Sequence, residues 1–161
     1  MTQVLVLVLA LFIGVIAGAR AMTAPAVVAW GAMLGWIDVA DKWSEWISHP
    51  ITVTVLTIFL VGELVTDQLP RTPSRKVPAQ FIARLITGGF SGAVIGSAFF
   101  HTFSATGAGV VGAVLGTLAG AELRSRLAKA NNGNDRPGAF IEDAIAVGGG
   151  LLVAFLVSLV S

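Results

Sequence analysis

The sequence predicts an all-α membrane protein, a polytopic bundle of about six hydrophobic helices in which some elements are short or broken. Hydrophobic residues make up 55% of the 161 residues and charged residues only 12%, about half the charge of a typical soluble domain. The mean hydropathy is +0.86. Apolar residues recur in runs of roughly 18 or more, the length that spans a bilayer. We therefore expect one integral membrane domain over residues 1–161.

Prolines and charged residues divide the chain into its predicted helices. The expected ranges are 3–21, 23–37, 51–69, 79–100, 104–127 and 139–160. Pro25 suits the first turn of the second helix, and Pro70 ends the third. The second range is short, so it is either a short span or a re-entrant element. No basic segment precedes the first range, so we expect a retained transmembrane helix and not a signal peptide.

The segment 36–48 is rich in tryptophan and acidic residues. Trp36 and Trp43 share one helical face with Ala40 and Ile47, and tryptophan is enriched where a membrane meets water. We expect an interfacial helix over 36–48, with Trp36, Trp43 and Trp46 as its anchors. An ordinary amphipathic linker is the alternative.

Loop charges predict the orientation. Residues 68–78 and 124–137 are expected to form basic loops, whereas the Trp-rich connection is acidic. The positive-inside rule places both basic loops in the cytoplasm, and both termini then lie outside. If the second range is re-entrant, the N-terminus moves to the cytoplasm.

Glycines recur every four residues in four of the predicted helices. Each such stripe makes one face flat, so that another backbone can approach closely. The pattern alone does not say whether the partner is in the same chain or in a second copy, and a homo-oligomer, most simply a dimer, is expected. The residues are Gly14, Gly18, Gly31, Gly35, Gly88, Gly92, Gly96, Gly112, Gly116 and Gly120.

Two registers of an internal repeat are open. One pairs Glu63 with Glu122 and Pro78 with Pro137, which implies repeated helix pairs. The other pairs the segment 30–35 with 111–116, which implies an inverted three-plus-three repeat of the transporter type.

Ionisable residues inside the predicted helices are candidate functional residues, because charge in a membrane is costly. Glu63 and Asp67 lie four residues apart near the end of a helix, where the dipole disfavours acids. Arg84 lies at a similar depth on the next helix, and a Glu63–Arg84 ion pair is expected. Arg20, Glu142 and Asp143 complete a polar layer near the cytoplasmic side. The layer is either a sealed salt-bridge network or the lining of a water-filled cavity.

Several other functions have no support in the residues. The net charge of +1 argues against nucleic-acid binding. The chain has no cysteine, and its two histidines, His49 and His101, match no metal spacing. No catalytic triad or phosphate-binding loop is present. We therefore expect no enzyme, no cofactor and no metal site.

Four segments resemble a known family of small bacterial membrane proteins. They are "AGARAMTAP" after the first helix, "FLVGELVTDQLP" ending the third, "ARLITGGFSGA" opening the fourth and "FIEDAIAVGGG" opening the sixth. In this order they resemble the family catalogued as domain of unknown function 4126. The chain departs from the family pattern at Arg20, where the family has Asn, and at Gln68, where it has Lys. The resemblance implies a fold and marks positions, but no activity.

Two functions follow as expectations for a multi-pass protein of the bacterial inner membrane. The first is a small transporter or channel-like protein whose polar layer of Arg20, Glu63, Asp67, Arg84 and Asp143 binds or relays a small ion, proton or solute. The second is a non-transporting scaffold or lipid-binding protein whose buried charges are structural. The lipid bilayer is the partner in both.

Overall fold

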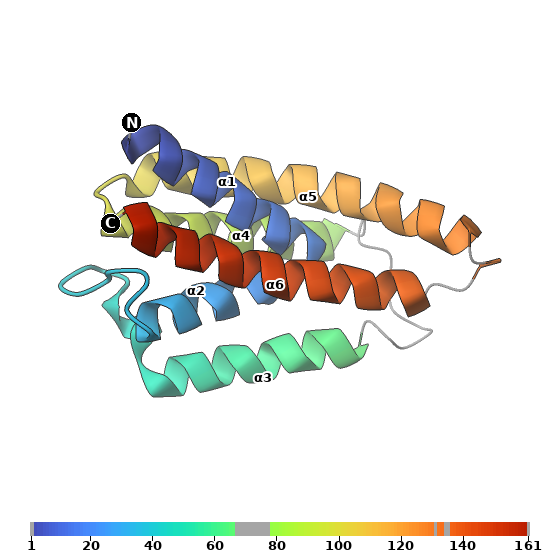
Figure 1. The fold of residues 1–161 in the computed structure, drawn as a ribbon, viewed down its shortest axis with the longest axis horizontal. Coiled ribbons are helices and arrows are strands. Elements are labelled where there is room, and N and C mark those ends of the chain that lie inside the picture. Colours follow the sequence, from blue (N-terminus) through green and yellow to red (C-terminus); the bar gives the residue numbers. More distant parts are fainter. Residues whose placement is uncertain (1, 67–77, 131, 134–135, 161) are drawn as a thin grey trace.

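The computed structural model describes residues 2–66, 78–130, 132–133 and 136–160, all arranged as a helical bundle (Figure 1). The predicted fold class is confirmed, because the described residues form helices and no strands. The elements are α1 (Thr2–Ala19), α2 (Thr23–Met33), the one-turn 3-10 helix η1 (Glu45–Ser48), α3 (Pro50–Thr66), α4 (Pro78–Ala98), α5 (Thr102–Ala130) and α6 (Arg136–Val160).

Four of these helices are long and apolar enough to cross a membrane. They are α1, α4, α5 and α6, the last over Gly138–Val160. Helices α2 and α3 are shorter apolar helices. At ~1.5 Å per residue, α2 rises only ~16 Å, about half the ~30 Å thickness of a hydrocarbon core. Helix α2 is therefore a half-length element beside four helices of spanning length.

The centre of the bundle is a glycine-lined junction of α1, α4 and α5. Gly109 of α5 lies against the backbone of Gly14 in α1 and of Gly88 in α4. A methyl group on any of these three glycines would collide with backbone atoms of a neighbouring helix. The small residues therefore let three backbones meet with little side chain between them.

The same spacing continues along the α1–α5 contact. Gly112 lies against the carbonyl of Leu11, and Gly116 lies one turn further along against the carbonyl of Val15. On α4, Gly92 lies against the carbonyl of Ala105 in α5, and Gly96 lies against the carbonyl of His101, the residue just before α5. These glycine faces contact helices of the same chain.

The remaining helices surround this centre less tightly. Helix α6 packs on α1 and α2, and α3 packs on α2 and η1 at the edge of the bundle (Figure 1). Val53 is the one buried residue of α3. The Trp30 indole N–H of α2 donates to the Thr57 hydroxyl of α3 over 2.9 Å. Helix α3 is thus the least embedded of the six.

The second helix ends four residues earlier than the sequence predicts. Gly35 has φ +78°, the left-handed conformation that glycine adopts readily. The amide of Gly35 donates to Ala32 O (3.2 Å) and that of Trp36 donates to Gly31 O (2.8 Å), the pattern of a Schellman cap. Gly35 is therefore a helix terminator and no part of a helix-packing stripe, whereas Gly31 packs on Ala154 of α6.

The predicted interfacial helix over 36–48 is wrong except for its last turn. Residues 36–44 form bends and turns, and only Glu45–Ser48 are helical. Asp41 has φ +57°, and the Asp38 carboxylate accepts the Ala40 amide over 3.2 Å, so local polar groups stop a helix. Trp43 and Trp46 are half exposed beside Phe90, whereas Trp36 packs edge-on against Phe155.

The fifth helix is longer than expected. Helix α5 continues to Ala130, so Arg124, Arg126 and Lys129 are helical and do not lie in a loop. Strong helix formers fill this stretch, and the Arg126 guanidinium binds Glu122 one turn earlier over 2.8 Å. Residues 68–77 of the other predicted basic loop lie outside the described residues.

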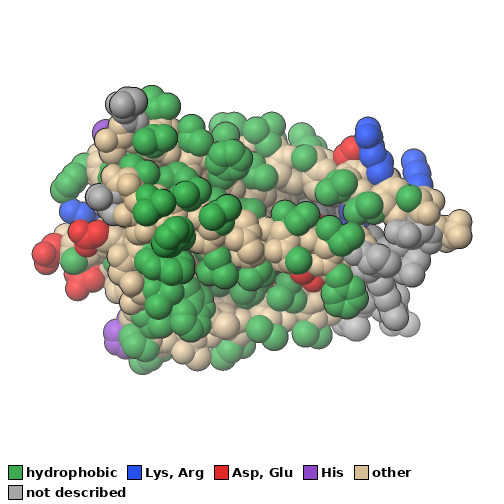
Figure 2. Space-filling view, viewed as in Figure 1, with side chains coloured by type: hydrophobic (Ala, Val, Ile, Leu, Met, Phe, Trp, Pro, Cys, Tyr) green, Lys and Arg blue, Asp and Glu red, His purple; other side chains and the backbone are tan. Residues whose placement is uncertain are grey.

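The two ends of the bundle differ in charge. The described termini lie at the end that holds the loop before η1, and α5 finishes at the opposite end (Figure 1). Asp38, Asp41 and Glu45 are exposed at the first end, and Arg126 and Lys129 at the second (Figure 2). We call the second end the basic end.

Two glycines on one helix test the central junction. Gly109→Ala places a methyl group against the Gly88 backbone, and such overpacking costs about 1–3 kcal/mol. Gly107→Ala, two residues away, has no atom within 4 Å of the new methyl and gains up to about 1 kcal/mol of helix propensity. Thermal unfolding in detergent should show opposite shifts of the midpoint. Equal shifts would contradict the packing described above.

Candidate functional site

The strongest candidate site is the break between α1 and α2, at residues 20–22. Helix α1 rises ~27 Å before it stops, and α2 then turns back into the bundle (Figure 1). Arg20 in the break and Thr23 at the start of α2 are 0% exposed, whereas Ala21 and Met22 are partly buried. A break buried in an apolar bundle leaves backbone groups that lipid cannot satisfy, so protein groups must bind them.

Glu63 binds the start of α2. Its Oε1 accepts the Ala21 amide over 2.9 Å, and its Oε2 accepts the Met22 amide over 2.8 Å. Both donors lie at the positive end of the α2 dipole, where an anion is favourable. The carboxylate reaches them from the last turn of α3, the least embedded helix. The acid that this apolar helix carries therefore caps another helix.

Arg84 binds the end of α1. Its Nη1 donates to Gly18 O over 2.5 Å and to Ala19 O over 2.8 Å. These carbonyls lie at the negative end of the α1 dipole, where a cation is favourable. The Thr117 hydroxyl of α5 lies 3.3 Å from Gly18 O as well. The break is therefore held by opposite charges at its two helix ends.

Arg20 lies within the break, and its guanidinium forms an ion pair with Asp143 of α6. The Arg20 side chain is 0% exposed and that of Asp143 is 16% exposed. The site thus brings together charged side chains from the break itself, from α3, from α4 and from α6. Their charges sum to zero over Arg20, Arg84, Glu63 and Asp143.

The structure differs from the predicted polar layer in its pairings. Glu63 and Arg84 form no ion pair with each other in the described part of the chain; each binds backbone at one side of the break. The dipole ends of the broken helix separate them. Asp67 lies outside the described residues.

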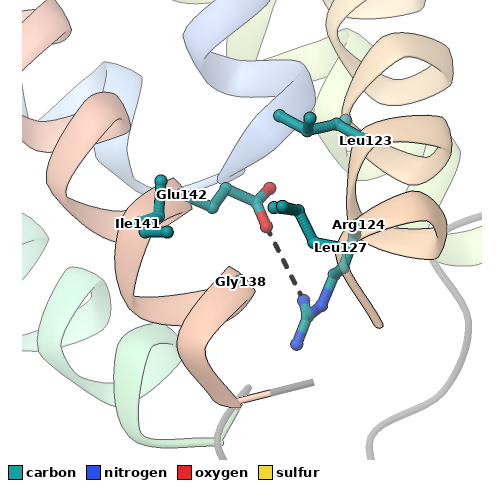
Figure 3. A pocket seen from close by; sticks show the side chains of 7 residues that line it. Leu123, Arg124, Leu127, Gly138, Ile141 and Glu142 are labelled. Carbon is teal, nitrogen blue, oxygen red and sulfur yellow. Dashed lines mark ion pairs between the residues drawn. The ribbon is translucent and has the colours of Figure 1, made fainter. Parts of the chain in front are cut away.

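Glu142 faces away from the break. Its carboxylate lies 3.8 Å from the Arg124 guanidinium, across a small groove between α6 and α5 (Figure 3). Glu142 and Asp143 are neighbours in sequence, yet they bind different partners because successive residues of a helix point in different directions.

Two features of the site carry no signal in the sequence. The hydroxyl of Thr117 joins the break from the middle of a glycine stripe, and the amides of Ala21 and Met22 are ligands that any residue type would supply.

Thr23 and Ser91 have fully buried hydroxyls with no hydrogen-bond partner among the described residues. No group of three acids or histidines suited to a metal ion occurs in the described ranges.

The comparison with family models decides the family. The model of the domain of unknown function 4126 matches residues 7–160, nearly the whole chain. The chain belongs to this family. No curated protein and no solved structure matches it. Family membership confirms the resemblance seen in the four sequence segments, and these segments include the break, Glu63, Arg84 and Asp143.

Glu63→Ala should destabilise the bundle by about 1.5–3 kcal/mol, because it leaves two part-buried amides at the break without their charged acceptor. Glu122→Ala is a matched control: it removes an exposed acid whose ion pair with Arg126 is worth about 0–1 kcal/mol. Chemical unfolding in mixed micelles measures both. A loss at Glu63 no larger than at Glu122 would refute the capping role.

A double-mutant cycle tests the Arg20–Asp143 pair. Arg20→Met and Asp143→Leu should each cost about 3–5 kcal/mol, because each leaves a buried charge without its partner. The double variant should lose less than the sum, with a coupling energy of about 0.5–3 kcal/mol. The free energy of unfolding of all four proteins gives the answer. Strictly additive losses would mean that the pair contributes nothing.

Proposed function

We propose that the chain is a small bacterial membrane transporter or channel-like protein that binds or relays a small ion, proton or solute at the α1–α2 break. One observation carries the proposal: the turn between α1 and α2 is buried in an apolar bundle, and charged groups on three other helices converge on it.

Two physical arguments support it. Buried charge in a membrane is expensive, so it is retained where it serves a pathway or a site. Discontinuous helices in transporters place opposite half-helix ends at the substrate site. Here the α1 carbonyl end and the α2 amide end meet at residues 20–22. A solute or proton that exchanges with Glu63 or Arg84 would bind these ends directly.

Helix α3 supplies a means of access. It carries Glu63, yet only Val53 of its residues is buried. Movement of α3 away from α2 would withdraw the carboxylate from the amides of Ala21 and Met22 without disturbing the glycine-lined junction. The site would then open while the centre stays closed.

A second function, a non-transporting scaffold, is favoured by a different observation. Glu63 and Arg84 each make two hydrogen bonds to the break, and Arg20 is paired. Such a network would also serve simply to fix the broken helix. In this case the charges are structural and the break never meets water.

The proposal includes a membrane topology. The basic end would face the cytoplasm of a bacterial inner membrane, with both termini outside, as the positive-inside rule requires. A dimer remains part of the proposal, but the glycine faces of α1, α4 and α5 are already in contact within the chain, so it would use other surfaces. The inverted repeat stays a prediction.

The absence of cysteine allows a clean test. Thr23→Cys and Ser91→Cys replace buried hydroxyls by similar thiols, and Leu152→Cys is a lipid-facing control with 57% exposure. Each variant is treated in native membranes with a membrane-impermeant thiol reagent. For a transporter, we expect Thr23→Cys to react at least tenfold faster than Leu152→Cys, because an open state admits water to the break.

The remaining outcomes separate the two functions. Faster labelling at Ser91, which lies two turns beyond Arg84 on α4, would extend the water path along that helix. Labelling of Thr23→Cys no faster than Leu152→Cys, in protein that folds and elutes normally, would refute the transport proposal and leave the scaffold.

A further inference from the structure

The start of α2 binds a carboxylate, which Glu63 supplies from the last turn of α3. Its Oε1 accepts the Ala21 amide over 2.9 Å, and its Oε2 accepts the Met22 amide over 2.8 Å. Each carboxylate oxygen binds one amide, so the two amides are spaced for a planar group that has two oxygens on one carbon. Helix α2 has 11 residues, and its positive dipole end strengthens the binding of an anion here.

A further polar group at the same helix end is left unused. Thr23 is the first residue of α2 and is 0% exposed, and its hydroxyl has no hydrogen-bond partner among the described residues. Side chains of an α-helix tilt toward its N-terminus, so the Thr23 side chain is directed toward the break. A buried hydroxyl without a partner is costly. Glu63 does not satisfy this hydroxyl, which leaves a donor for another ligand.

The charges around the break favour an anion as that ligand. The side chains of Arg20, Arg84, Glu63 and Asp143 are neutral as a set. Withdrawal of Glu63 leaves two arginines and one aspartate, an excess of one positive charge that a monoanion would neutralise. A cation would meet both this excess and the amide end of α2, which is unfavourable.

Glu63 is held mainly by the amides that it binds. It forms no ion pair with any described residue, and Val53 is the one buried residue of its helix. Its neighbour Gly62 has no atom of another element within 4 Å of where a Cβ would lie. A tethered group competes with a free ligand at an effective concentration set by the tether. A free carboxylate would therefore compete with Glu63 for the same two amides.

We propose that the start of α2 is a binding site for a small monocarboxylate, and that Glu63 is a tethered competitor that fills the site when no ligand is bound. The two oxygens of the ligand accept the Ala21 and Met22 amides, and the Thr23 hydroxyl donates to one of them. The proposal names the substrate class of the transporter proposed above, and it rests on that function for access in the wild-type protein.

Other ligands match the site less well. Chloride has no pair of oxygens to match the two amides. A phosphate dianion carries more charge than the excess that remains when Glu63 withdraws. A proton bound to Glu63 would turn one acceptor oxygen into a donor that faces an amide. The monocarboxylate alone uses both amides and the hydroxyl.

Chemical rescue tests the site. Glu63→Ala removes the competitor and leaves the amides and the Thr23 hydroxyl in place. Unfolding is followed in detergent while sodium formate replaces sodium chloride at constant ionic strength. At a formate concentration tenfold above its dissociation constant, the ratio of folded to unfolded protein should rise about elevenfold. Glu122→Ala is the control: it lacks an exposed acid outside the break and should not respond.

Three further variants sharpen the test. In the Glu63→Ala background, Thr23→Val removes the hydroxyl but keeps the shape, and should weaken formate binding about threefold or more. Ser91→Ala removes another buried hydroxyl without a partner, about 10 Å along α4 from Arg84, and should leave binding unchanged. Glu63→Gln keeps the side-chain volume, so it serves if Glu63→Ala fails to fold. It should respond to formate more than the wild type does, because a neutral amide is a weaker competitor.

The outcomes are distinct from those for transport. Formate that stabilises Glu63→Ala and Glu63→Gln no more than Glu122→Ala would overturn the proposal, as would equal losses from Thr23→Val and Ser91→Ala. Stabilisation by formate with slow thiol labelling of Thr23→Cys would support the carboxylate site and refute transport. Rapid labelling without stabilisation would overturn the carboxylate site and leave the transport proposal standing.

Discussion

The whole arrangement depends on the need to bind the peptide groups of a broken helix in an apolar environment. Lipid offers no hydrogen bonds, so every free amide or carbonyl at residues 20–22 must find a protein partner. Glu63 supplies the acceptor and Arg84 the donor. Both charges are tolerated in the bundle because Glu63 faces the positive N-terminal end of α2 and Arg84 faces the negative C-terminal end of α1. The break needs these charged side chains, and the helix ends at the break stabilise the charges in turn.

The molecule has two parts that differ in how tightly their helices pack. The α1–α4–α5 junction has so little side-chain volume between backbones that it cannot easily change shape. Helix α3 has the opposite character, with one buried residue and polar links through Glu63 and Trp30. The rigid junction thus carries Arg84, whereas Glu63 lies on the weakly attached α3. A protein of this size can in this way hold a fixed frame and still have one element that is weakly attached.

Much of the fold follows from the sequence, because apolar runs and prolines define the membrane helices directly. The end of α2 could also have been predicted, since Gly35 with an apolar residue before and after it is a helix-capping signal. The turns before η1 were harder, because the tryptophans share a helical face that the chain does not use. Polar side chains such as Asp38 compete for the backbone there, and no periodicity reports that competition.

The site was predicted as a set of residues but not as a set of contacts. Depth along each helix suggests that Arg20, Glu63, Arg84 and Asp143 lie near one level, and the structure brings all four to the α1–α2 break. Opposite charges that lie close together nevertheless have several ways to pair. The actual partners are decided by where α1 stops, and backbone ligands have no residue type to reveal them. Helix α6 brings Asp143 to Arg20 from more than a hundred residues away, a contact that only the packing of α6 on α1 determines.

The position of Arg84 has a consequence for synthesis on the ribosome. The carbonyls at the end of α1 receive their cation from α4, which emerges more than sixty residues later. Helix α2 is too short to cross a bilayer alone. Until α4 has been made, the carbonyls at the end of α1 lack the Arg84 guanidinium. The end of α1 can therefore reach its final contacts only after α4 has been synthesised.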